Sequence, residues 1–174
     1  MTNSFPGKSP SIVSDHHLRA IGAVIVNWSM LEIIMETAIL GLYEITPDRG
    51  LVITNNLGFQ SKLTILRILA LNGAIKDKDQ ARKWTALLQR IELTAPKRNH
   101  IAHGIWGGSQ VQGIATRHSI SVRGKRLRTK VEKVPLSEIE GASNEILDLI
   151  SEFRQLAQDA KALPEMPGVD TPRS

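Results

Sequence analysis

Residues 84–104 read WTALLQRIELTAPKRNHIAHG, a pattern that is helical up to the final glycine. Its apolar residues recur at helical spacing, at Trp84, Leu87, Leu88, Ile91 and Ala95. That spacing predicts a helix with one buried face, which starts around residues 77–79 and ends at Gly104. Pro96 lies inside the helix, so we expect a lost backbone hydrogen bond and a kink there.

After this helix the period of the sequence changes to two. The even-numbered residues are largely apolar, whereas the odd-numbered positions carry Arg117, Ser119, Ser121 and Arg123. A similar alternation follows Gly124, and Pro135 ends it. The two alternating segments predict a β-hairpin over residues 110–134.

Helical patterns flank the hairpin on both sides. We expect a long helix from Ser14 or Asp15 to about residue 43, a short helix from Pro47, and a third from Phe59 that stops at Gly73. A last helix is expected to be capped near Ser137. The predicted fold is mainly α, an antiparallel helical bundle with a basic β-hairpin inserted before the C-terminal helix. We expect one domain over residues 14–163, with disordered tails at 1–13 and 164–174.

The composition limits the chemistry. The chain has 174 residues and no cysteine, which excludes disulfides, thiolate nucleophiles and cysteine-containing metal sites. Its net charge of +5 is unevenly placed, because residues 82–133 hold twelve basic and two acidic side chains and the remainder carries a net −5. A basic middle segment attracts phosphates, which favours RNA as a partner, although such a segment can also be only a solvated face.

Targeting and membrane signals are weak in this sequence. Residues 1–11 contain no apolar h-region, so they do not resemble a signal peptide. The most apolar stretch, residues 20–42, is interrupted by Asn27, Glu32 and Glu36, which argues against a membrane span. We therefore expect a cytoplasmic protein with no membrane partner.

The densest cluster of reactive side chains closes the helix that contains Pro96. Asn99 and His103 are four residues apart and therefore neighbours on a helix, where an asparagine can orient an imidazole for proton transfer. Arg98 adds a planar fork of donors that suits a phosphate. A histidine that moves protons and an arginine that holds a phosphoryl group suffice for RNA cleavage without a metal.

The arrangement Arg98-Asn99-(three residues)-His103 resembles the R-polar-x-x-x-H signature of the HEPN family (higher eukaryotes and prokaryotes nucleotide-binding domains). The resemblance covers residues 14–106, including a long upstream helix with Trp28, Leu31 and Glu32, and leaves the hairpin uncovered. It implies an all-helical core and a metal-independent endoribonuclease that needs no cofactor.

By this resemblance the 2′-hydroxyl of RNA attacks the adjacent phosphorus. His103 would act as general acid or base, Arg98 would stabilise the phosphorane and Asn99 would orient its neighbours. The resemblance also implies a homodimer with the site at its interface. Such a protein could serve as a toxin or phage-defence effector, with an antitoxin or nucleotidyltransferase as partner. The alternative is a non-catalytic dimeric module that binds nucleic acid or a partner.

Other interpretations of these residues stay open. Arg98 and His103 could form only a structural cap, with His103 bonding the last helical carbonyls. His100 supports the site or binds a metal with His103, but no carboxylate lies nearby in the sequence, so we predict no metal site. Glu32 either contacts a base such as Arg98 or faces a subunit interface. His16 and His17 are expected on the surface.

The hairpin is predicted to be an electrostatic arm. It contains no aromatic residue, so it should grip the backbone of a nucleic acid rather than read bases. The alternatives are a charged edge that deters aggregation and an edge that docks a protein partner. The predicted nucleic-acid-binding residues are Lys97, Arg117, Arg123, Lys125, Arg126, Arg128 and Lys130.

Overall fold

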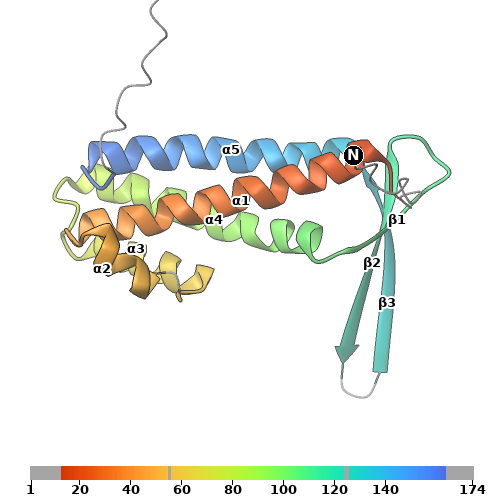
Figure 1. The fold of residues 1–174 in the computed structure, drawn as a ribbon, viewed down its shortest axis with the longest axis horizontal. Helices are drawn as coiled ribbons and strands as arrows, with labels where there is room; N and C mark the ends of the chain where they lie inside the picture. The colour runs from red at the N-terminus through yellow and green to blue at the C-terminus, as the bar shows by residue number, and fades with distance from the viewer. Residues whose placement is uncertain (1–12, 55, 124–125, 164–174) are drawn as a thin grey trace, which may run out of the picture. The chain divides into compact units, whose positions relative to one another are not determined.

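The structure is a computed structural model that describes residues 13–54, 56–123 and 126–163 (Figure 1). Over these residues the chain forms five helices and three strands. In chain order the elements are α1 (Asp15–Leu42), α2 (Pro47–Thr54), α3 (Phe59–Leu71), α4 (Lys78–Ala102), β1 (Ile105–Gly107), β2 (Ile114–Arg123), β3 (Arg126–Pro135) and α5 (Leu136–Asp159). The prediction of a mainly helical chain with β structure before the C-terminal helix is confirmed.

The helix boundaries follow from local chemistry. Asp77 precedes α4, and its Oδ1 accepts the backbone N–H of Gln80 at 2.7 Å, as an N-cap does. Gly73 follows α3 with a φ of +87°, the left-handed conformation that commonly ends helices. α4 continues through Pro96 and ends at Ala102, two residues before the predicted end. The last helix begins at Leu136, directly after β3, one residue before the predicted cap at Ser137.

The described chain divides into two compact units. The sheet unit contains the described residues up to Val26 together with Lys97–Asn144, and the helical unit contains Asn27–Pro96 together with the described residues from Glu145 onward. The predicted tails lie outside the described residues except for Val13, which is buried.

The helical unit has an apolar core built from four helices. The rings of Trp84 on α4 and Phe153 on α5 meet edge to face with centroids 5.0 Å apart, and Trp28 on α1 lies at the same distance from Phe59 on α3. Leucines and isoleucines of the same four helices are also buried, at Leu31, Leu63, Leu66, Leu87, Leu88, Ile91 and Ile146. This burial of regularly spaced apolar residues makes the unit a helical bundle.

The sheet unit contains a three-stranded antiparallel sheet in the order β1-β2-β3. The two long strands pair along their whole length, from Ile114↔Pro135 to Arg123↔Arg126. The predicted hairpin is therefore correct in its two strands, but β1 was not predicted. β1 has three residues, too few for an alternating pattern to stand out, and its pairing with β2 is what makes it a strand.

α1 is long and apolar enough to cross a membrane by length and composition alone. Of its most apolar window, 44% is buried inside the structure, and core helices of soluble proteins pass the same test. The structure is thus compatible with a soluble protein.

Candidate functional site

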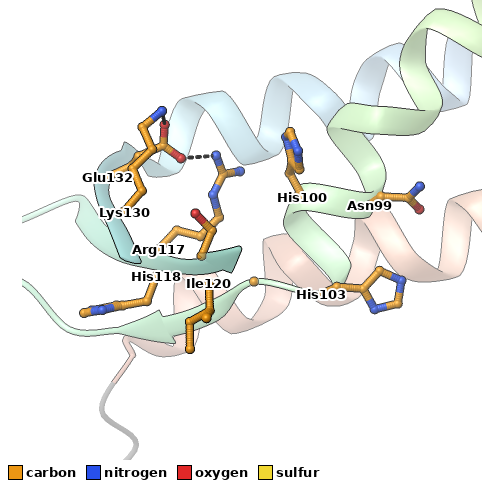
Figure 2. A pocket seen from close by; sticks show the side chains of 10 residues that line it. Asn99, His100, His103, Arg117, His118, Ile120, Lys130 and Glu132 are labelled. Carbon is orange, nitrogen blue, oxygen red and sulfur yellow. Dashed lines mark hydrogen bonds and ion pairs between the residues drawn. The ribbon is translucent and has the colours of Figure 1, made fainter. Parts of the chain in front are cut away.

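The sheet unit contains a cleft of about 390 Å³ where α4 ends against the sheet (Figure 2). The end of α4 supplies Asn99 and His100, and His103 and Gly104 follow directly after the helix. The remaining lining residues come from β2 and β3 and are Arg117, His118, Ser119, Ile120, Lys130 and Glu132. The cleft therefore brings part of the predicted signature together with part of the predicted basic hairpin.

Gly104 allows this close approach of helix and strand. A Cβ atom at Gly104 would lie 2.8 Å from Cγ of Arg117 and 2.8 Å from the carbonyl oxygen of His100. Since real Cβ contacts are essentially never this short, a side chain here would push the Arg117 stem away from the helix end. The adjoining chain is held by Trp106, whose Nε1 donates to the carbonyl oxygen of Ile101 at 2.9 Å.

The signature residues point in two directions. Asn99 and His103 lie one helical turn apart, and Figure 2 shows both side chains on the side of the helix turned away from Arg117. His100 lies on the side that faces Arg117. Asn99, His100 and His103 are all exposed, so the amide and both imidazoles are accessible to a ligand.

Arg98 does not line the cleft. It is half-buried, and its Nη1 donates to Oδ1 of Asn99 at 3.0 Å. Among the described residues, no hydrogen bond joins the Asn99 side chain to the His103 ring, and none joins that ring to a helical carbonyl. The geometry thus makes Arg98 the group that holds Asn99, which differs from the role at phosphorus that the resemblance implies.

Two cations in the cleft share one carboxylate. Nη2 of Arg117 lies 2.5 Å from Oε2 of Glu132, and Lys130 pairs with the other oxygen of Glu132. The hydrogen bonds from Lys130 and Arg117 lower the pKa of Glu132 from its ordinary value of 4.5 to about 2. Glu132 is therefore ionised at neutral pH, and this cluster keeps one uncompensated positive charge beside three imidazoles.

The other predicted binding residues are more scattered. Lys97 is half-buried on α4 outside the cleft, and Arg128 is exposed on β3. Arg123 and Arg126 pair at the far end of β2 and β3. Their side chains, and the whole of Lys125, lie outside the described residues.

Glu32 belongs to the helical unit and has no part in the cleft. It accepts a hydrogen bond from Nε1 of Trp28 at 2.6 Å, and Nζ of Lys62 lies 3.6 Å from its Oε2. Lys62 also pairs with Glu36. These contacts tie Glu32 to the helical unit, where α3 carries a buried lysine against the same face of α1.

Sequence reasoning missed several features of the sheet unit. His118 lines the cleft, and the signal available in the sequence was a titratable residue among the largely apolar even-numbered positions of β2. His17, expected on the surface, is buried, and its Nδ1 lies 2.7 Å from Oγ of Ser14. In the described part of the chain, no group of three or more histidine, aspartate or glutamate side chains is placed to hold a metal ion.

Comparisons with protein families, with curated proteins and with solved structures found no match for this chain.

Proposed function

We propose that the protein is a metal-independent endoribonuclease of HEPN type that cleaves RNA by attack of the 2′-hydroxyl. The observation that carries the proposal is the cleft itself, which joins Asn99 and His103 of the signature to Arg117 and Lys130 of the basic sheet. Imidazoles that can transfer protons, beside an uncompensated positive charge, suit the transesterification of a phosphodiester.

The reaction has a simple balance of bonds and protons. The 2′-oxygen forms a bond to phosphorus, the bond from phosphorus to the 5′-oxygen breaks, and the products are a 2′,3′-cyclic phosphate and a 5′-hydroxyl. One group takes the proton of the 2′-hydroxyl and another returns a proton to the 5′-oxygen. We assign one of these transfers to His103 and the other to His100, which both line the cleft.

The negative charge on the phosphorane needs donors already in position. Arg117 and Lys130 supply them, since Glu132 compensates only one of these two cations. Arg98 acts as a positioning residue, because its hydrogen bond fixes Asn99 at the edge of the cleft. The 2′-hydroxyl restricts the substrate to RNA, and no Phe, Tyr or Trp is among the described residues that line the cleft.

The placement of Asn99 and His103 supports a homodimeric site. Both are exposed and turned away from Arg117, as groups would be that meet a second copy of the chain. In such a dimer the second copy would place its own Asn99 and His103 opposite the first pair. Light scattering after gel filtration tests this, with a dimer as the expected result and a monomer at micromolar concentration as the opposing one.

Digestion of a labelled RNA oligonucleotide in EDTA tests the activity. We expect the wild type to cleave and His103→Ala to be at least about 100-fold slower, the range expected for loss of a general acid or base. His16→Ala is the matched control, because His16 is an exposed histidine outside the cleft. Equal cleavage by the wild type and His103→Ala, or none by micromolar wild type, contradicts the proposal. An all-deoxy oligonucleotide must resist cleavage.

One observation favours a second candidate, a module that binds nucleic acid or a partner without cleaving it. Arg98, the arginine of the signature, lies outside the cleft and is engaged by Asn99. Binding of the same oligonucleotide without any cleavage by the wild type would identify this function. A role as toxin or phage-defence effector, countered by an antitoxin or nucleotidyltransferase, belongs to the first candidate and predicts that wild type but not His103→Ala arrests bacterial growth.

A further inference from the structure

The central strand of the sheet is open along part of one edge. β1 covers only three residues of β2, in the pairs Ile105↔His118, Trp106↔Arg117 and Gly107↔Thr116. β2 continues to Arg123, and from Ser119 onward it is paired with β3 on one side and with no described strand on the other (Figure 1). Alternate backbone N–H and C=O groups of this segment therefore face outward, as on an edge strand that can accept another strand.

This open edge lacks the protection that the other edge of the sheet has. Residues 119–123 read SISVR, so the one charge of this segment is at its end, on Arg123. β3, which forms the opposite edge, carries Arg128, Lys130, Glu132 and Lys133 within six residues. Because charged side chains keep edge strands from pairing, the two edges are differently suited to strand addition, and the open part of β2 is the receptive one.

One face of the sheet beside this edge is apolar and exposed. Ile105, Ile120 and Val131 are exposed by 58, 57 and 55%. Ile105 and Val131 both pair with His118, and Ile120 follows two residues later on the same face of β2. An added strand would therefore cover apolar surface with every second side chain.

The opposite face is basic at the same position. Lys130 pairs with Ser119, a small residue, so the lysine stem has no bulky neighbour between it and the open edge. Arg117 lies two residues before Ser119, and the single carboxylate of Glu132 compensates only one of these two cations. The remaining side chains of an added strand would meet positive charge.

We propose that the open edge of β2, residues 119–123, accepts an extended segment of a protein partner as a fourth strand, with apolar side chains over Ile120 and acidic side chains toward Lys130. Successive side chains of the added strand would point to opposite faces of the sheet. Those on one face would meet the exposed apolar side chains, and those on the other would meet the positive charge of the cleft. An RNA would satisfy the charge but not the row of backbone donors and acceptors, and a second copy of β2 would bring the basic end of its own hairpin toward the cleft.

Such a strand would also block the cleft. Ser119 and Ile120 lie on the open edge and line the cleft, so the partner would sit across its mouth. Inhibition of RNA cleavage by the partner is the consequence, and only this consequence rests on the proposed function. Strand addition itself does not require the protein to be an enzyme.

Fluorescence anisotropy with a labelled alternating Val-Glu octapeptide tests the binding. We expect saturable binding to the His103→Ala protein, so the result does not depend on catalysis. The same octapeptide with proline at its fifth position loses a backbone donor, and we expect it to bind at least tenfold more weakly. An alternating Val-Lys octapeptide should not bind. Equal binding of the Val-Glu peptide and its proline version overturns the proposal, because charge alone would then explain the affinity.

A protein variant locates the binding surface. Ile120→Glu places a carboxylate on the open edge at an exposed position, and we expect at least a tenfold loss of affinity for the Val-Glu peptide. Leu93→Glu is the matched control, because Leu93 is also an exposed apolar residue but lies on α4 in the helical unit. Far-ultraviolet circular dichroism is used to check that both variants fold. Equal effects of the two substitutions overturn the proposal.

Amide hydrogen exchange identifies the strand that is added to. Bound peptide should slow exchange at residues 119–123 and leave the β3 amides unchanged. Protection along β3 instead overturns the choice of edge.

Two outcomes would assign the edge to another occupant, and both require that the wild type does not bind the peptide. If Ile120→Glu then loses RNA binding, the edge binds RNA. If Ile120→Glu instead loses a dimer that the wild type forms, the edge binds a second copy of the chain. RNA cleavage by the wild type in EDTA is measured separately. Its outcome decides the proposed ribonuclease function, whereas the peptide experiments decide strand addition.

Discussion

The two units of the molecule contain ionic clusters of opposite balance. In the helical unit one cation, Lys62, lies between the carboxylates of Glu32 and Glu36 and is only 4% exposed. In the sheet unit one carboxylate, that of Glu132, lies between the cations Arg117 and Lys130 at an open cleft. Both clusters join neighbouring elements. The cluster in the helical unit has more carboxylates than cations, whereas the cluster in the sheet unit has one more cation than carboxylates.

This difference separates structure from binding. A buried lysine that lost its carboxylates would have no water to replace them, so the helical cluster fixes α3 against α1. In the sheet unit solvent reaches the cluster, and a phosphate or carboxylate can compensate the extra cation. We therefore expect anionic groups to bind at the ion pairs where cations outnumber carboxylates and the side chains are accessible to solvent.

The largest expected effect is on the stability of the helical cluster. Lys62→Ala leaves two carboxylates close together without their cation, and removal of one partner from a buried pair costs about 3–5 kcal/mol of unfolding free energy. Urea denaturation measures this loss. The control Lys83→Ala changes an exposed lysine and should stay within about 0.5 kcal/mol of the wild type. A loss below about 1 kcal/mol for Lys62→Ala would remove the contrast between the clusters.

The next effect is on RNA binding by the sheet unit. Arg117→Ala removes a cation from the cleft, and we expect RNA affinity to fall about tenfold to a hundredfold, as for hydrogen bonds to a charged group. Filter binding with an RNA oligonucleotide measures it. Arg82→Ala is matched, because Arg82 also pairs with a carboxylate, that of Asp79, but lies in the helical unit. Equal losses for the two variants would show that net charge alone attracts RNA.

A smaller effect concerns the salt dependence of that binding. Lys130→Ala should lower the slope of log K against log salt by about 1, since one phosphate contact is lost. The slope comes from titrations between low and physiological salt. Lys83→Ala should leave the slope unchanged. An unchanged slope for Lys130→Ala would mean that Lys130 forms an ion pair with Glu132 but contacts no phosphate.

The smallest effect is the acid dependence of stability. Because the pKa of Glu132 is about 2 in the folded protein and its ordinary value is 4.5, its ion pairs stabilise the fold fully above pH 4.5 and are lost as the pH falls toward 2. Glu132→Gln lacks this contribution. We expect the melting temperature of the variant to lie below that of the wild type at neutral pH and the two to converge toward pH 2. A difference that is constant with pH contradicts this assignment.

Much of the fold follows from local signals. Apolar residues at helical spacing placed the helices, and Asp77 and Gly73 marked boundaries because capping and left-handed glycine are properties of a few adjacent residues. The pairing of β2 with β3 followed from alternation on both sides of Gly124. β1 escaped prediction because three residues become a strand only through their neighbour.

The candidate site was predictable only in part. Asn99, His100 and His103 are adjacent in sequence, so their grouping at one helix end was visible beforehand. The distance of these three residues from Arg117 and Lys130 depends on how closely the helix end approaches the strand at Gly104. A glycine in the sequence does not indicate which residue will lie against it. Likewise, nothing local to Glu32 indicates that its cation is Lys62.

Local signals in the sequence set the helices and the two long strands, the basic character of residues 82–133 and the residue types available for chemistry. These depend on spacing, composition and capping, which act over a few residues. The tertiary structure decided which charges meet, which side chains share the cleft and which edge of the sheet stays open. Those outcomes depend on contacts between residues far apart in the chain, where the geometry of packing, rather than local preference, sets the partner.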